Sequence, residues 1–157
     1  DLHKALVRAA TEADLSFNEF CVRRLRASAD LNAVSEARSQ VVTRARAVFG
    51  DALWGAVVLG SWARGEAGPA SDIDVLLVLD PRRDLTREVY RDWDAEPLIT
   101  DGRAVDAHFA HPPEAGAPPT AVWCEAAIDG IVWYDRDGLM ATRLADIRRA
   151  IAEGRVV

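Results

Sequence analysis

Two short apolar runs that lie close together in the sequence constrain the fold of this chain most. The first, residues 53–59, ends abruptly at Gly60. The second, residues 72–79, is rich in Val, Ile and Leu but carries Asp72 and Asp74. Short runs of this composition favour strands of a buried sheet. Because alternate residues of a strand point to the same face, the carboxylates of Asp72 and Asp74 are predicted to lie side by side.

The residues around these runs suit the binding of a cation and of phosphate. Two neighbouring carboxylates repel each other unless a cation lies between them, and their oxygens suit Mg²⁺ shared with substrate phosphates. Gly60 lets the backbone approach a ligand, and Ser61 offers a hydroxyl and an amide where a strand gives way to a helix. Alone, a Gly-Ser pair is more often a simple turn, and an Asp-x-Asp pair more often a solvated strand edge. Together, with ten residues between Ser61 and Asp72, they form a far more specific signal.

A later strand is predicted over residues 103–109, where apolar residues alternate with Asp106 and His108. The alternation places the acid and the imidazole on one face of that strand. An ionised carboxylate in an apolar strand is costly unless it is paired or binds a cation, although Asp106 could also face water from an edge strand. His108 either contacts a substrate or is a structural histidine, and the second is the commoner role of a lone strand histidine.

The central motif resembles that of a known superfamily. Residues 60–65 read Gly-Ser-Trp-Ala-Arg-Gly, and residues 71–74 read Ser-Asp-Ile-Asp before an apolar strand. This pattern resembles the signature of the DNA polymerase beta-like nucleotidyltransferases, in particular the minimal nucleotidyltransferases. The resemblance implies an α/β (α+β) nucleotidyltransferase fold, with a mixed β-sheet and helices packed mainly on one face. Residues 1–50 are predicted to form an N-terminal helical segment, and residues 51–157 a single nucleotidyltransferase domain.

The resemblance also implies a site. In that family a third carboxylate comes from a later strand, and Asp106 fits this position. The carboxylates would hold two Mg²⁺ ions, or Mn²⁺ in their place, and the phosphates of an NTP would lie at the glycine–serine corner. The predicted catalytic and metal-binding residues are Asp72, Asp74 and Asp106; the predicted nucleotide-binding residues are Gly60, Ser61, Arg64 and Ser71; His108 is a secondary candidate.

Three functions are compatible with these residues. The first is transfer of NMP, with AMP from ATP favoured, to a hydroxyl of an unidentified acceptor. The second is the antitoxin of a toxin–antitoxin pair, and the third is a catalytically silent nucleotide-binding module. Antibiotic-modifying members of the superfamily carry a large helical domain after the catalytic one, but only about fifty residues follow Asp106. The acceptor is therefore expected to bind at the N-terminal helices, at a second copy of the chain in a homodimer, or at a helical toxin partner.

Composition adds a few limits. A chain of 157 residues can form one domain with a sizeable core, and a net charge of −6 argues against general nucleic-acid binding. Cys21 and Cys124 lie far apart without metal-ligand spacing, which indicates reduced thiols. The sequence shows no signal peptide and no apolar run long enough to cross a bilayer, so a cytoplasmic protein without a membrane partner is expected.

The flanking elements are predicted from their periodicity. Residues 1–50 are expected to be helical, with an N-cap at Ser16 and a break at residues 30–32. After a turn, Asp84 is expected to cap the next helix. The remaining elements are expected to be a helix over residues 120–129, a strand over residues 131–134 and a helix over residues 140–151.

Overall fold

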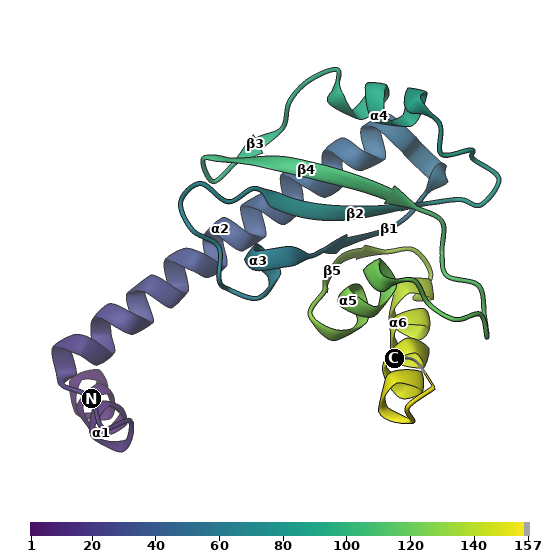
Figure 1. The fold of residues 1–157 in the computed structure, drawn as a ribbon. Helices are drawn as coiled ribbons and strands as arrows, with labels where there is room; N and C mark the ends of the chain where they lie inside the picture. Colours follow the sequence, from purple (N-terminus) through teal and green to yellow (C-terminus); the bar gives the residue numbers. More distant parts are fainter. Residues whose placement is uncertain (156–157) are drawn as a thin grey trace. The chain divides into compact units, whose positions relative to one another are not determined.

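The computed structural model describes residues 1–155, apart from the side chains of residues 26–32. The chain forms two compact units, residues 1–37 and residues 38–157. Its elements (Figure 1) are α1 (Leu2–Glu12), α2 (Phe17–Phe49), the 3₁₀ turn η1 (Gly50–Ala52), β1 (Leu53–Val58), α3 (Gly60–Ala63), β2 (Ile73–Leu79), α4 (Arg87–Asp94), β3 (Ile99–Thr100), β4 (Arg103–Ala110), α5 (Ala121–Ile128), β5 (Ile131–Asp135) and α6 (Leu139–Ala152).

The five strands form one mixed sheet in the order β3-β4-β2-β1-β5. β1 pairs antiparallel with β2 and with β5, whereas β2 pairs in parallel with β4. The short β3 pairs antiparallel with β4 at the sheet edge. The predicted α/β fold with a mixed sheet and N-terminal helices is thereby confirmed.

One face of the sheet packs against the end of α2 and against α4. Phe49, at the end of α2, lies 5.5 Å from the ring of Phe109 on β4 and 6.5 Å from Trp93 on α4, measured between ring centroids. Tyr90 of α4 also meets Phe109 edge-on at 4.8 Å. Phe109 and Asp106 are three positions apart on one strand, so they point to opposite faces. The aromatic cluster therefore supports the sheet from behind the acid-bearing face.

The opposite face is partly covered by α5 and α6. Trp123 of α5 and Met140 and Leu144 of α6 form a buried cluster with Leu76 and Val78 of β2. Those two strand residues alternate with Leu77 and share their face with Asp74. Both faces of the sheet thus carry helices, and α5 and α6 cover the end of β2 beyond Asp74. Burial of such side chains typically contributes about 1.5–3 kcal/mol each, so this cluster holds the acid-bearing strand rigidly in place.

Two local expectations are wrong. The break expected at residues 30–32 is absent from the backbone, because α2 runs without interruption from Phe17 to Phe49. Asp and Asn lower helix propensity by less than about 0.7 kcal/mol each, and the stretch contains neither Gly nor Pro. The cap of α4 is Thr86, whose side chain accepts a hydrogen bond from the Glu88 amide, and not Asp84.

Ser16 caps α2 as expected, since its hydroxyl accepts a hydrogen bond from the backbone amide of Glu19. The predicted helix, strand and helix that end the chain are present as α5, β5 and α6. Among the helices in the described part of the chain, none combines the length and the apolar character that a bilayer crossing requires.

Candidate active site

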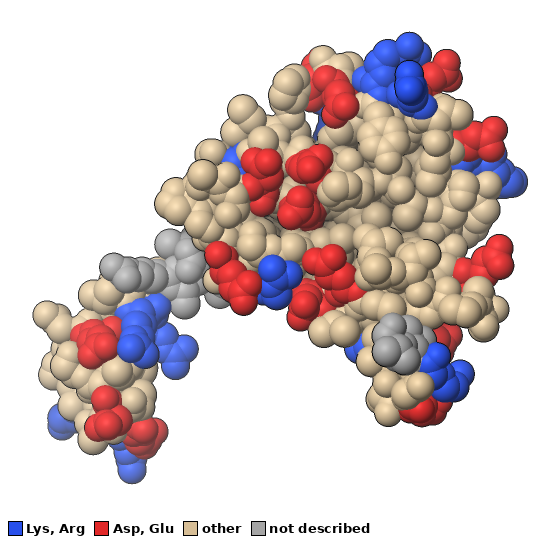
Figure 2. All heavy atoms as spheres, viewed as in Figure 1, with Lys and Arg blue, Asp and Glu red and all other residues tan. Residues whose placement is uncertain are grey.

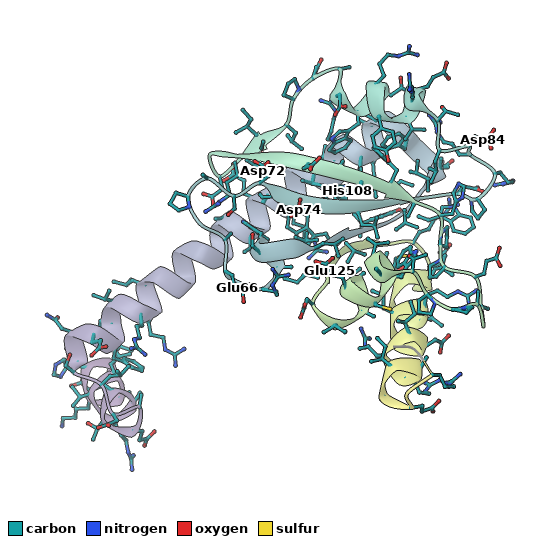
Figure 3. All side chains as sticks on the ribbon, in the orientation of Figure 1. Glu66, Asp72, Asp74, Asp84, His108 and Glu125 are labelled. Atoms are coloured by element: carbon teal, nitrogen blue, oxygen red, sulfur yellow. The ribbon has the colours of Figure 1, made fainter. Side chains whose placement is uncertain are left out.

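The register of β2 and β4 brings two carboxylates together. The parallel ladder pairs Asp74 with Asp106 and Leu76 with His108, and paired residues of adjacent strands point to the same face. His108 Nε2 lies 3.9 Å from Asp74 Oδ1 and 3.8 Å from Asp106 Oδ2. One ligand atom from each of the three side chains lies within 4.8 Å of the others. Figure 3 shows Asp74 and His108 converging on the same face of the sheet. We call Asp74, Asp106 and His108 the carboxylate–histidine cluster.

The electrostatics of Asp74 indicate a site that favours positive charge. Burial is the main cause that raises the pKa of the Asp74 carboxyl, and the charges of Asp106, Asp72 and Glu125 raise it further. His108 acts in the opposite direction and lowers this pKa. An ionised Asp74 is therefore costly here unless a cation compensates its charge.

The glycine–serine corner lies directly against Asp74. Gly60 begins α3 with φ +67°, a left-handed conformation that residues with a Cβ adopt only with strain. A Cβ added at Gly60 would collide with Oδ2 of Asp74. The Leu59 amide, one residue earlier, donates a hydrogen bond to the backbone carbonyl of Asp74 at 2.9 Å. Glycine is therefore favoured at this position both for its conformation and for its lack of a side chain, because any Cβ here would displace the Asp74 carboxylate.

A cleft of about 360 Å³ opens at this corner and is lined by Leu59, Gly60, Asp74, His108, Val122 and Glu125. Glu125 comes from α5 and faces Asp74 across the cleft (Figure 3). Sequence reasoning missed Glu125, although a single acid inside the otherwise apolar helix of residues 121–128 could have marked it. In the space-filling view, acidic side chains gather over the same face (Figure 2).

The other predicted site residues lie around the cluster and not in it. Asp72 precedes the first residue of β2 and is not one of the three clustered ligands, although its charge acts on Asp74. Arg64 pairs with Glu66 at 2.9 Å and with Glu125 at 3.7 Å, which places its guanidinium at the rim of the cleft. Ser61 follows Gly60 in the first turn of α3.

Ser71 organises the loop that leads to Asp72. Its hydroxyl accepts a hydrogen bond from the backbone amide of Gly68 at 3.0 Å. Its backbone carbonyl accepts one from the Arg103 guanidinium, also at 3.0 Å, and the same guanidinium group contacts the Gly68 carbonyl. The Ser71 hydroxyl therefore stabilises the loop before β2. Its contact with a nucleotide stays a prediction.

The cluster has the donors that a divalent cation needs. Carboxylate oxygens are hard ligands suited to Mg²⁺ and Mn²⁺, and the imidazole adds a nitrogen donor. The raised pKa of Asp74 fits the same interpretation, because a bound cation would favour its ionised form. The residues present thus fit a divalent metal ion.

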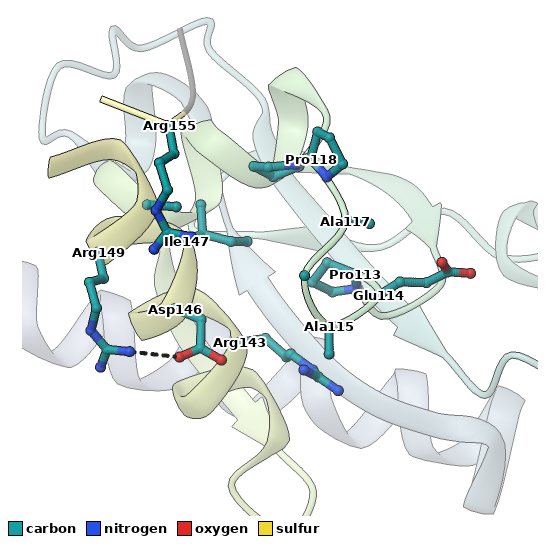
Figure 4. A pocket seen from close by; sticks show the side chains of 13 residues that line it. Pro113, Glu114, Ala115, Ala117, Pro118, Arg143, Asp146, Ile147, Arg149 and Arg155 are labelled. Atoms are coloured by element: carbon teal, nitrogen blue, oxygen red, sulfur yellow. Dashed lines mark hydrogen bonds and ion pairs between the residues drawn. The ribbon is translucent and has the colours of Figure 1, made fainter. Parts of the chain in front are cut away.

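A second cavity, of about 460 Å³, lies between the loop of residues 113–119 and α6 (Figure 4). Arg143, Arg149 and Arg155 are among its lining residues, and Arg149 is paired with Asp146 at 3.4 Å. It is larger than the cleft beside Asp74. However, Asp74, His108 and Gly60 line the smaller cleft, so its chemistry and not its size marks it as the candidate active site.

Comparison with known protein families gives one match. Residues 49–124 match the family of the nucleotidyltransferase domain, and they contain β1, β2 and β4. No curated protein matches the chain.

Solved structures with a similar fold include three toxin–antitoxin complexes. One is a toxin–antitoxin with AMP-PNP, at 13% identity over 75% of this chain and 92% of that chain, with a TM-score of 0.45. Another is a mutant of the toxin–antitoxin MntA-HpeT, at 12% identity, 75% and 92% coverage and a TM-score of 0.44. A third is the tri-AMPylated HEPN toxin of Shewanella oneidensis with MNT antitoxin, at 12% identity, 75% and 89% coverage and a TM-score of 0.43.

Proposed function

Because this chain belongs to the nucleotidyltransferase-domain family and is therefore a transferase, we propose that it transfers NMP from an NTP to a hydroxyl acceptor at the cleft beside Asp74. AMP from ATP is the favoured group. The proposed ions are Mg²⁺ or Mn²⁺, and the proposed ligands are Asp72, Asp74 and Asp106. When bound, two such ions supply positive charge to both the attacking and the leaving oxygen.

The observation that carries this proposal is the contact between Gly60 and Asp74. A glycine in the left-handed conformation, where a Cβ would collide with Asp74, lies against one carboxylate of a pair that faces the same side of the sheet. Backbone amides at this corner would bind phosphate oxygens, and the carboxylates would hold cations that neutralise the phosphate charge. An ordinary turn followed by a solvated strand edge requires no such contact.

The reaction is a displacement at the α-phosphorus. The acceptor oxygen forms a bond to phosphorus, the bond to the β-phosphate oxygen breaks, and pyrophosphate leaves with the bonding electron pair. We assign Asp106, whose side chain is 60% exposed and so open to solvent, the role of the base that takes the acceptor's proton. Gly60 and Ser61 bind the phosphates, and Arg64 is a further contact at the rim. In such reactions positioning and electrostatic stabilisation supply most of the acceleration.

The test is transfer of label from each of the four NTPs, in the presence of Mg²⁺ or Mn²⁺ and a cell extract as the source of acceptor. Label in the α-phosphate is expected to become covalently attached to an acceptor, whereas label in the γ-phosphate is expected to leave with pyrophosphate. Asp74→Asn and Asp106→Asn should abolish transfer. Asp84→Asn, which removes an exposed carboxylate far from the cleft in Figure 3, should retain it.

The acceptor distinguishes the remaining possibilities. Label on a small molecule or on RNA assigns the acceptor directly, and label on a helical protein partner assigns the antitoxin function with AMP-type modification of that partner. Absence of transfer from all four nucleotides with either ion contradicts the proposal. Transfer that survives in Asp74→Asn contradicts the assignment of the site.

A further inference from the structure

His108 adds a nitrogen donor to a metal site whose ligands are predicted from the sequence to be carboxylates alone. The distances from its Nε2 to the carboxylate oxygens of Asp74 and Asp106, 3.9 and 3.8 Å, are too long for hydrogen bonds. Two ligand atoms that each lie about 2.1 Å from one ion are about 3 Å apart at a right angle and about 4.2 Å apart when opposite. The two distances from Nε2 lie between these values, as expected for an imidazole that shares an ion with either carboxylate.

The carboxylate–histidine cluster differs by one residue from the predicted metal ligands, because it contains His108 in place of Asp72. Among the residues that the structure describes, Asp74, Asp106 and His108 form the one group of three side chains able to hold a metal ion together. Asp72, the first aspartate of the sequence motif, is not part of that group. The third donor that lies close to the carboxylate pair is thus an imidazole.

The type of donor bears on the choice of ion. Mg²⁺ prefers six oxygen ligands and gives up its waters reluctantly, whereas divalent ions of the first transition row accept an imidazole more readily, and Mn²⁺ is the member of that row that also suits carboxylates. We propose that His108 is a metal ligand together with Asp74 and Asp106, and that this position therefore binds Mn²⁺ in preference to Mg²⁺. The inference deepens the proposed function, because the same cluster is the proposed catalytic centre.

The surroundings of the cluster allow an ion to be reached from solvent. The side chains of Asp74, His108 and Asp106 are 37%, 52% and 60% exposed, and the first two line the cleft. Gly60 lies on the other side of Asp74, so an ion held by His108 would be next to the proposed phosphate position. His108 is therefore placed to select the ion without blocking the cleft.

The experiment measures metal binding directly, without nucleotide, on the full chain. Mn²⁺ binding is followed by electron paramagnetic resonance and Mg²⁺ binding by competition. Electron spin echo modulation then reports whether a ¹⁴N nucleus is bonded to Mn²⁺. The chain contains three histidines. His108→Ala removes the proposed ligand, and His111→Ala is the matched control, because the His111 ring contacts the Arg83 carbonyl at 2.8 Å in a loop after β4.

We expect a ¹⁴N signal in the wild type and in His111→Ala, and its loss in His108→Ala. Removal of one ligand should weaken Mn²⁺ binding by about tenfold or more while Mg²⁺ binding changes by less than about twofold. A Mn²⁺ affinity or ¹⁴N signal that persists in His108→Ala overturns the inference. If His108→Ala loses the ¹⁴N signal but the wild type transfers no nucleotide, the metal site is supported and the proposed function is contradicted. The two proposals can therefore fail separately.

Discussion

The requirement for glycine at position 60 can be tested with a pair of matched substitutions. Gly60→Ala adds one Cβ at a residue with φ +67°, where that Cβ would meet Oδ2 of Asp74. Gly65→Ala adds the same group five residues later at φ +71°, where nothing lies within 4 Å of the new atom. The two variants therefore share the backbone strain and differ in the collision with the carboxylate.

The expected magnitudes follow from these two effects. Placing an L-residue in the left-handed region costs about 1–2 kcal/mol, so both variants should lose about that much free energy of unfolding. Only Gly60→Ala must also displace the Asp74 carboxylate, and a shift of about 1 Å in a catalytic group can reduce the rate about 10²-fold. Such a loss corresponds to about 2.7 kcal/mol of transition-state stabilisation.

The assays are urea unfolding for stability and α-label transfer for activity, both on the full chain. Gly60→Ala is expected to be as stable as Gly65→Ala and about 10²-fold slower. Equal transfer rates in the two variants would refute the argument that the corner and the carboxylate form one site. A much larger stability loss in Gly60→Ala alone would show that the collision disturbs the fold and not only the cleft.

Two other predictions concern groups outside the cluster. The hydrogen bond from the Arg82 side chain lowers the pKa of Asp80 to about 2, below its unfolded value, so Asp80 stabilises the fold above about pH 4 and this contribution is lost as the pH falls towards 2. Asp80→Asn should accordingly be less stable at pH 7 and show a shallower loss of stability between pH 4 and 2 in urea unfolding. Arg103→Lys removes the guanidinium that contacts the carbonyls of Gly68 and Ser71 before the first motif aspartate. It should slow transfer about tenfold with little change in the circular dichroism spectrum, and an unchanged rate would contradict a role for this loop.

The strands that carry the site could be predicted, because each is specified by a short stretch of sequence. The apolar runs before Gly60 and after Asp72 became β1 and β2, and the alternating residues 103–109 became β4. The two apolar runs and the alternation of β4 are patterns of a few residues, so no knowledge of the partner strands is needed to identify them. The shared direction of Asp106 and His108 follows from the same alternation.

The parts that could not be predicted depend on contacts between distant segments. The order of the strands pairs Asp74 with Asp106; the family resemblance implied that these acids are neighbours, but no local pattern specifies the pairing. The lone acid of its apolar helix marks Glu125 as unusual, but its place at the cleft depends on the packing of α5 on Leu76 and Val78, which the helix sequence does not specify. The two-residue strand β3 is too short for any periodicity.

The cost of keeping Asp74 charged gives a final prediction about stability and function. Because burial and the charges of Asp106, Asp72 and Glu125 raise its pKa in the folded chain, the folded state binds this proton more tightly than the unfolded state does. The contribution of Asp74 to stability therefore becomes less favourable as the pH rises through its titration range. In a chelator at pH 7, Asp74→Asn should be more stable than the wild type in thermal unfolding, and Asp84→Asn should be unchanged. Adding Mn²⁺ should reverse the order, because an ion that binds only the folded wild type adds about 2.7 kcal/mol at a hundred times its Kd. If Asp74→Asn is the less stable chain without metal, the cost inferred for burying a charged Asp74 among other carboxylates is wrong.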